Sequence, residues 1–230
     1  MFDKLPISSK TEKILTKSLD EPISAEDANY LINIKGSDLY PLLATADYLR
    51  QEIAGDNVTF INNCNINFTN ICTVRCGFCA FGKDADDPEA YILDDEAILK
   101  KAQGAVDKGA HEFCVMGGVL PDADVEYYEH LLQLLKGEFP NIMIHGFSPT
   151  MIKDASVVSG ISVEDAFERL KSAGLDTLPG TAAEILTDRS REIICPEKVT
   201  TQEWIDIVKT AHEVGIPGSA TIMYGHVETP

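Results

Sequence analysis

Strand-like stretches alternate with helix-like stretches over most of this chain, from about residue 57 onward. Stretches rich in apolar and β-branched residues are each followed by glycine or polar residues and then, in most cases, by a stretch with helical periodicity. We expect five strands, over residues 58–67, 111–116, 142–147, 175–178 and 219–224. This alternation predicts an α/β fold with a parallel sheet, because parallel strands need long crossover connections.

The helices between these strands are marked by signals at their ends. We expect helices over residues 94–108 and 125–136, from Ser162 to Ala173, and from a capping box at Thr200 and Glu203 to Val214. A glycine follows each expected end and can adopt the left-handed conformation that closes a helix: Gly109, Gly137, Gly174 and Gly215.

Five strands joined by right-handed crossovers can curl toward a β/α barrel of the TIM type. A complete barrel of eight units needs about 250 residues, whereas residues 57–230 hold five expected strands. The last residues, 226–230, follow the fifth strand as the start of a further loop would. We therefore predict a partial barrel over residues 57–230, with its C-terminal part missing through truncation or a split gene.

Residues 1–56 lack this alternation and predict a separate N-terminal helical segment. Ser24 is expected to cap one helix, and Ser37 a second helix that runs through Leu42 and Leu49 and stops near Gly55. No catalytic motif lies in this segment, so we expect it to pack as a helical cap.

Three of the six cysteines lie close together after the first expected strand, as Cys72, Cys76 and Cys79. Iron–sulfur clusters normally take four cysteine thiolates, so three thiolates in a Cys-x3-Cys-x2-Cys arrangement would leave one iron of a cubane cluster open. An open iron can bind the amino and carboxylate groups of S-adenosylmethionine (SAM). Electron transfer from such a cluster cleaves SAM and yields a 5′-deoxyadenosyl radical, which abstracts hydrogen from a substrate.

Other interpretations of the three cysteines remain open. A zinc site needs a fourth ligand, and no second Cys-x2-Cys or histidine pair lies nearby. A ferredoxin-type carrier would have another cysteine two or three residues on, where Phe81 and Gly82 stand. A non-catalytic metal-binding or electron-transfer protein is thus the alternative of another class. The other cysteines, Cys64, Cys114 and Cys195, are expected to be small buried residues.

Active sites of β/α barrels lie at the carboxyl ends of the strands, and several candidate residues fall there. Gly117 and Gly118 can let the backbone approach the SAM amino group, or can simply form a turn. Glu184 can bind a sugar hydroxyl or the adenosine ribose, or be a solvated charge. His145 has a ligand-binding and a packing interpretation, and Tyr224 and His226 can donate hydrogen bonds or move protons. Ser148 and Thr181 also follow strands.

The sequence resembles the radical SAM enzymes that build deazaflavin precursors and futalosine-pathway menaquinone precursors. The stretches that carry this resemblance are residues 65–81, 116–118, 145–150, 179–186, 194–196, 204, 211–212 and 220–229. The resemblance implies a radical SAM β/α barrel in which Cys72, Cys76 and Cys79 ligate a 4Fe-4S cluster. It also places Phe78 at an aromatic position that packs near the adenine of SAM.

Within this group, the segment over residues 179–186 is most similar to the tyrosine-using subunit of FO synthase. That resemblance implies transfer of the 4-hydroxybenzyl group of L-tyrosine to 5-amino-6-(D-ribitylamino)uracil, in biosynthesis of the precursor of coenzyme F(420). Expected partners are the other FO synthase subunit and a reductant protein. Aminofutalosine synthase and dehypoxanthine futalosine cyclase are the alternatives, and these tend to have Gly-Gly-Gly-Ala-Glu where this chain has Gly180-Thr-Ala-Ala-Glu184.

The formal net charge of −18 predicts an acidic surface that repels nucleic acid and anionic lipid. No run of 18 apolar residues is present, and the N-terminus lacks the apolar region of a secretory signal. We therefore expect a cytoplasmic protein with small-molecule substrates and no nucleic-acid or membrane partner.

Overall fold

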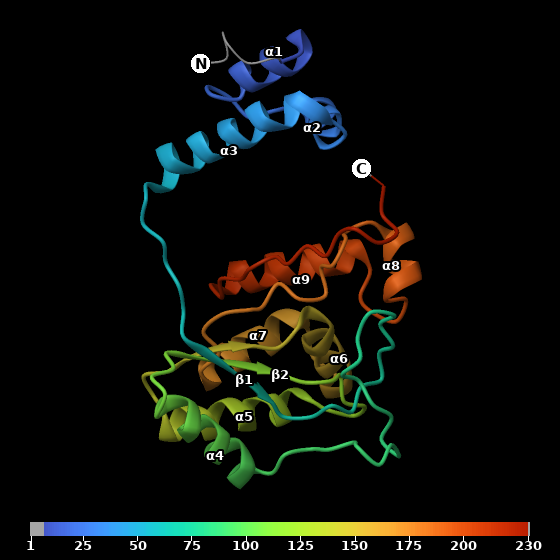
Figure 1. Cartoon of the computed structure of the whole chain (residues 1–230). Coiled ribbons are helices and arrows are strands. Elements are labelled where there is room, and N and C mark those ends of the chain that lie inside the picture. Colours follow the sequence, from blue (N-terminus) through green and yellow to red (C-terminus); the bar gives the residue numbers. More distant parts are fainter. Residues whose placement is uncertain (1–6, 230) are drawn as a thin grey trace. The chain divides into compact units, whose positions relative to one another are not determined.

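The computed structural model describes residues 7–229 (Figure 1). The contacts between residues divide this part of the chain into two compact units. The smaller one contains the described residues up to Phe60, and the larger one comprises Ile61–Glu228.

The smaller unit is helical, with α1 over Ser9–Lys17, α2 over Ala25–Ile32 and α3 over Leu39–Ala54. Its small core contains Ile14, Leu15 and Leu31. The predicted cap at Ser24 is confirmed, because its side chain accepts a hydrogen bond from the Asp27 N–H at 3.1 Å. After α3 the backbone turns at Gly55, with φ of 65°, and Phe60 beyond it is exposed.

The prediction that Ser37 caps the next helix is wrong. A 3-10 turn covers Gly36–Asp38, and Asp38 precedes α3 without capping it through its side chain. The Asp38 carboxylate instead accepts hydrogen bonds from the backbone N–H and hydroxyl of Ser8 and from the Thr11 hydroxyl. These bonds, that from the Ser8 hydroxyl foremost, lower the pKa of Asp38.

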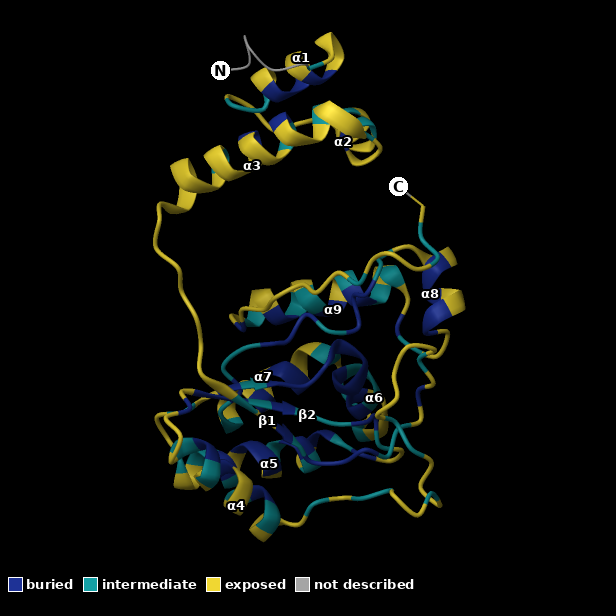
Figure 2. Ribbon diagram, viewed as in Figure 1, coloured by how far each residue is buried: buried dark blue, intermediate teal, exposed yellow. Residues whose placement is uncertain are grey.

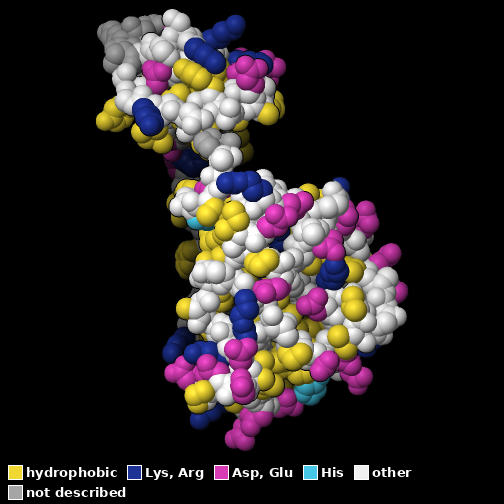
Figure 3. Space-filling model, turned by 90° about the vertical axis from the view of Figure 1, so that its right-hand side faces the viewer, with side chains coloured by type: hydrophobic (Ala, Val, Ile, Leu, Met, Phe, Trp, Pro, Cys, Tyr) yellow, Lys and Arg dark blue, Asp and Glu magenta, His cyan; other side chains and the backbone are white. Residues whose placement is uncertain are grey.

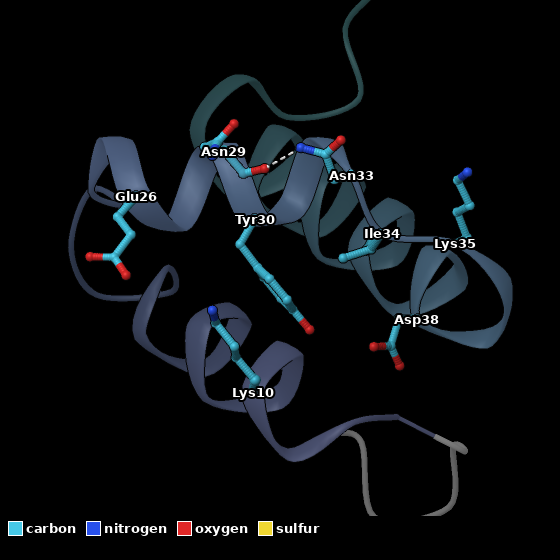
Figure 4. Close-up of a pocket in the computed structure, with 8 residues that line it drawn as sticks. All are labelled: Lys10, Glu26, Asn29, Tyr30, Asn33, Ile34, Lys35 and Asp38. Carbon is cyan, nitrogen blue, oxygen red and sulfur yellow. Dashed lines mark hydrogen bonds between the residues drawn. The ribbon is translucent and has the colours of Figure 1, made fainter.

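Figure 4 shows the polar cavity beside this network, with Tyr30 reaching between Lys10 and Asp38. The cavity measures about 500 Å³. The Lys10 ammonium lies 4.1 Å from the centroid of the Tyr30 ring. Tyr30 also contacts the Thr11 hydroxyl at 3.0 Å, so the network joins all three helical segments of the unit. The hydrogen bonds between the segments are a structural role for these polar side chains.

The larger unit is built on a parallel sheet of three strands in the order β1-β2-β3. These strands are Asn63–Asn67, Glu112–Met116 and Met143–Gly146, so the first three predicted strands are confirmed with shorter bounds. The register places Asn65 opposite Cys114 and Cys114 opposite His145. The arrangement is that of a partial β/α barrel.

The fourth and fifth predicted strands are present only as isolated parallel bridges. Thr177 pairs with His145, Leu178 with Gly218, and Glu184 with Ile222. Pro179 and Pro217 lack the N–H that a ladder needs, and Gly180 and Gly218 weaken extended backbone. The direction of the chain is therefore as predicted, while regular strands are not formed.

Successive helices contact one another in the order expected for β/α units (Figure 1). The predicted helices are confirmed as α4 over Asp95–Val106, α5 over Val125–Glu138, α7 over Val163–Ala173 and α9 over Thr201–Val214. The expected end of α5 at Gly137 is wrong, because the helix runs to Glu138 and Phe139 then packs on Phe113. Two helices were not predicted: α6 over Pro149–Ser159 and α8 over Asp188–Ile194.

The two faces of the sheet differ in chemistry. Ile66, Val115 and Ile144 lie on the face covered by the helices and belong to the main core, which Figure 2 shows as buried. Alternate residues lie on the opposite face, which in a closed barrel is the interior. That face is mostly polar and carries Asn63, Asn65, Asn67, Glu112, Cys114, Met116, Met143 and His145.

None of the helices within residues 7–229 combines the length and the apolar run that crossing a bilayer requires. Acidic side chains are spread over the visible face of the larger unit, with fewer lysines and arginines among them (Figure 3). This distribution fits the excess of 37 acidic over 19 basic side chains.

Glu203 gives the fold a pH-dependent contact at the start of α9. Its carboxylate pairs with Lys153 and accepts hydrogen bonds from the Thr200 backbone and hydroxyl, as the predicted capping box requires. Lys153 foremost lowers the pKa of Glu203 to about 2. Because the folded pKa lies below the usual value of 4.5, this stabilisation is full above pH 4.5 and is lost as the pH falls toward 2.

We therefore expect Glu203→Gln to lower the free energy of unfolding at pH 7 by up to about 1 kcal/mol, as for partly exposed ion pairs. Urea denaturation at pH 7 and pH 3 should show a smaller difference from wild type at the lower pH. Glu213→Gln, at an exposed position near the end of α9, is the control. A difference that grows on acidification would contradict this assignment.

Candidate active site

A cavity of about 240 Å³ lies at the carboxyl ends of β1 and β2 and is lined by Cys72, Cys76 and Cys79. Most of its other walls are apolar side chains, including Val74, Phe78 and Phe81. Polar residues reach it from later connections, after β3 and around α8. Loops separated by more than 100 residues therefore meet where the fold predicts an active site.

The loop that carries the cysteines is held by backbone hydrogen bonds to distant segments. The Val119 N–H donates to the Sγ atom of Cys72 at 3.2 Å, and the Cys72 N–H donates to the Lys83 carbonyl at 3.1 Å. The Gly77 N–H donates to the Ile194 carbonyl at 2.8 Å. Two sides of the loop are thus fixed, one against the end of β2 and the other against α8.

Burial raises the pKa of Cys76 to about 11, and the nearby Lys198 ammonium acts in the opposite direction. Cys195 is buried as predicted, while Cys64 and Cys114 are only partly buried.

Gly117 and Gly118 line the cavity, and both approach the chain before Cys72 closely. A Cβ on Gly118 would lie 2.0 Å from the Ile71 carbonyl oxygen, and one on Gly117 would lie 2.9 Å from the Phe68 ring. The Gly118 N–H also donates to the Thr69 carbonyl at 3.0 Å. These glycines therefore have a clear packing role, whatever ligand their backbone contacts.

Glu184 reaches the cavity and is paired there with a residue that the sequence did not single out, Lys198. The Lys198 ammonium donates to the Glu184 carboxylate at 2.7 Å, and the two side chains are 15% and 10% exposed. The same ammonium lies 5.3 Å from the centroid of the Phe78 ring. An acidic group, a basic group and an aromatic ring are thus assembled beside the cysteines.

Three predicted site residues do not line this cavity. His145 lies on the polar face of the sheet, where its Nδ1 is 2.6 Å from the Thr177 hydroxyl and burial lowers its pKa. Tyr224 is 81% exposed. His226 is held locally, with its Nε2 2.8 Å from the Met223 carbonyl and its Nδ1 accepting from the Val227 N–H. If these three residues contact a ligand, they do so outside this cavity.

Ser148, Thr181 and Met116 also line the cavity, together with Gly82, Val119 and Ala182. Ser148 and Thr181 follow expected strands, so the rule of strand ends indicated them. Met116 is the last residue of β2, at a position that shares the polar face with Asn67. The cavity is thus continuous with the face that would be the barrel interior.

No group of three or more His, Cys, Asp or Glu side chains among residues 7–229 is arranged to hold one metal ion directly. The three cysteines instead surround a cavity. Iron–sulfur clusters take cysteine thiolates and are tuned by hydrogen bonds to sulfur, and the bond from Val119 to Cys72 is of this kind. This donor set fits a cluster held by the three thiols at one side of the cavity.

The sequence matches the Radical SAM superfamily over residues 66–230. The FeFe-hydrogenase maturase HydG is structurally similar, with a TM-score of 0.71 at 18% identity, over 94% of this chain and 47% of that one. Methylornithine synthase gives a TM-score of 0.63 at 18% identity, over 91% and 57% of the two chains.

Curated relatives are more similar in sequence. A 5-amino-6-(D-ribitylamino)uracil–L-tyrosine 4-hydroxyphenyl transferase from Methanothermobacter thermautotrophicus is 49% identical over 97% of this chain and 61% of its own length. A protein of the same name, numbered 1, from Methanosarcina mazei is 46% identical over 95% of this chain and 56% of its own length. The chain thus spans less than two thirds of the length of these relatives.

The close approach of Gly118 generates a prediction. Gly118→Ala places a Cβ against the Ile71 carbonyl and must displace the cysteine loop, at a cost on the order of 1–3 kcal/mol or more. We expect iron incorporation after anaerobic reconstitution to fall well below that of wild type, measured as iron and sulfide per chain.

Gly104→Ala is the matched control, since a Cβ there meets no atom within 4 Å. Alanine within α4 should stabilise the chain by about 0.5–1 kcal/mol and leave the iron content unchanged. Full iron incorporation by Gly118→Ala would show that the contact does not position the cysteines.

Proposed function

Because this chain belongs to the radical SAM superfamily, we propose that Cys72, Cys76 and Cys79 hold a 4Fe-4S cluster and that the adjoining cavity binds SAM. The cluster and SAM together supply one-electron chemistry that produces a hydrogen-abstracting radical. The observation that supports this proposal is the convergence of the three thiols, Phe78 and the Glu184–Lys198 pair on one cavity.

Each side chain has a specific part in this proposal. Phe78 offers a ring face for the adenine, and Glu184 accepts hydrogen bonds from the ribose hydroxyls or the amino group. Lys198 provides the positive charge that a ligand carboxylate needs in a site with apolar walls. Gly117 and Gly118 leave the backbone at the end of β2 accessible to the ligand, and the apolar walls limit the entry of water.

We propose that the reaction is transfer of the 4-hydroxybenzyl group of L-tyrosine to 5-amino-6-(D-ribitylamino)uracil. Relatives named for this activity are 44–49% identical to the chain. The Cα–Cβ bond of tyrosine would be cleaved. The 4-hydroxybenzyl fragment would add to C5 of the uracil, and the rest of the amino acid would leave as 2-iminoacetate. The enzyme would act in FO biosynthesis with the other FO synthase subunit and a reductant protein.

The polar face of the sheet supports a substrate of this chemistry. Asn65, Asn67 and His145 offer amide and imidazole groups to the uracil and the ribityl hydroxyls, where a packed barrel has bulky aliphatic residues. Tyr224 and His226 would contact substrate or move protons at the barrel mouth. We propose a cytoplasmic location, because a reducing compartment keeps thiols available as cluster ligands.

Turnover by the reduced, reconstituted chain tests this function. With SAM, L-tyrosine and the diaminouracil, we expect 5′-deoxyadenosine to form in a tyrosine-dependent manner, together with the uracil adduct, detected by mass spectrometry. Cys76→Ala should remove the cluster and abolish both products. Cys64→Ala, at a position on β1 outside the cavity, should retain them.

Formation of 5′-deoxyadenosine that is indifferent to tyrosine would contradict the transferase while leaving radical SAM chemistry intact. Turnover of a futalosine-pathway substrate would identify the menaquinone alternative. A cluster whose properties are unaffected by SAM would instead favour a non-catalytic electron carrier.

A further inference from the structure

The Glu184–Lys198 pair in the cavity is contributed by two segments that flank α8. Glu184 ends the segment from Gly180, and Lys198 follows the helix after Cys195. The pair is therefore formed only if both segments keep their positions against α8.

Arg191 of α8 is bonded to both of these segments. Its side chain is buried, at 3% exposure, and its Nη1 donates to the carbonyls of Ala182 at 2.8 Å and Ala183 at 2.7 Å. Its Nε donates to the carbonyl of Val199 at 3.1 Å, and its Nη2 donates to the same oxygen. The bonded carbonyls lie directly before Glu184 and directly after Lys198.

The segment before Glu184 needs such support. Ala182 and Glu184 have φ of 69° and 49°, in the left-handed region that residues with a Cβ seldom adopt. All four carbonyls from Thr181 to Glu184 accept hydrogen bonds, from Trp204, twice from Arg191, and from the Met223 N–H. Arg191 supplies the central two of these bonds.

Arg191 makes no ion pair within residues 7–229, although its charge, after the hydrogen bonds from Thr201, contributes to lowering the pKa of Asp188 on the same helix. A buried charge bonded only to neutral carbonyls is unfavourable unless its geometry is needed. The planar guanidinium, with donors pointing in several fixed directions, can join two chain segments at once, whereas a lysine ammonium has a single centre.

We infer that Arg191 is a positioning residue for the cofactor: it fixes the backbone on either side of the Glu184–Lys198 pair, so that both charged groups are presented to SAM. Arg191 does not line the cavity itself, so its effect is transmitted through these two residues. This inference rests on the proposed SAM site but not on the identity of the substrate.

The direct test is the dissociation constant for SAM of the reconstituted, reduced chain, measured from the change in the electron paramagnetic resonance spectrum of the cluster. We expect Arg191→Lys and Arg191→Gln to weaken binding by about 10- to 100-fold, by analogy with the loss of groups that orient metal ligands. Iron per chain should stay at the wild-type level. Arg189→Gln, on the same helix and bonded only to the Val227 carbonyl, should bind SAM as wild type does.

A double-mutant cycle separates positioning from a general structural effect. If Arg191 acts by positioning the Glu184–Lys198 pair, the loss caused by Arg191→Lys should largely disappear in a background that carries both Glu184→Gln and Lys198→Gln. Equal losses in both backgrounds, or wild-type SAM affinity of Arg191→Lys, would overturn the inference. The SAM dissociation constant is measured without tyrosine or the uracil. A failure of the proposed transferase reaction would therefore leave this test of Arg191 unaffected.

Hydrogen exchange of the cluster-free chain gives a second readout that needs no turnover. The amide of Met223 donates to the Glu184 carbonyl at 2.9 Å, and the amide of Thr221 donates to the Gly180 carbonyl at 3.1 Å. We expect both amides to exchange faster in Arg191→Lys than in wild type, with no change in α5. Unchanged exchange at both positions in Arg191→Lys would contradict the inference. This readout does not depend on whether Arg191→Gln folds.

Discussion

The backbone contact between Gly118 and the Ile71 carbonyl sets the distance between the end of β2 and the loop that carries the cysteines. A side chain on Gly118 would separate the two segments, and the hydrogen bond from Val119 to the Cys72 sulfur depends on the same approach. On its other side, the loop is joined to α8 through Gly77 and Ile194. The site is therefore fixed by main-chain contacts, with three thiols left facing a cavity.

The parallel sheet brings the remaining groups to that cavity. Since the carboxyl ends of parallel strands share one edge, residues such as Ser148 and Glu184 reach the cysteines from distant parts of the chain. The same geometry leaves the amides of β1 on the face that a complete barrel would enclose. A cluster and SAM at the carboxyl ends of the strands would then lie beside this polar face, where the proposed reaction needs its polar substrate.

Local signals predicted much of the fold. Ser24, Ser162 and Thr200 were identifiable as caps because each side chain bonds to a backbone N–H three residues ahead. Helix α6 has comparable signals, with Ser148 before Pro149 and Gly160 after its end, and could have been found from them. Ser37 was misassigned because it lies inside the 3-10 turn that precedes α3. The next residue, Asp38, is bonded to Ser8 and Thr11, a contact that no local pattern reveals.

The three cysteines and several residues that line their cavity were identifiable from spacing and from the rule of strand ends. Lys198 and Arg191 were not, because they lie around a short helix and meet Glu184 and its carbonyls only through tertiary packing. Tyr224 and His226 follow a strand in the sequence, but the fifth strand is reduced to isolated bridges and does not bring them to the cavity.

The proposed chemistry depends on whether Cys72, Cys76 and Cys79 hold a cluster with one iron free to bind SAM. The most direct measurement is the electron paramagnetic resonance spectrum of the dithionite-reduced, reconstituted chain, recorded with and without SAM. We expect a reduced 4Fe-4S signal whose g values shift when SAM is added and that is absent from Cys76→Ala. A signal that SAM leaves unchanged, or one that persists in Cys76→Ala, would contradict it.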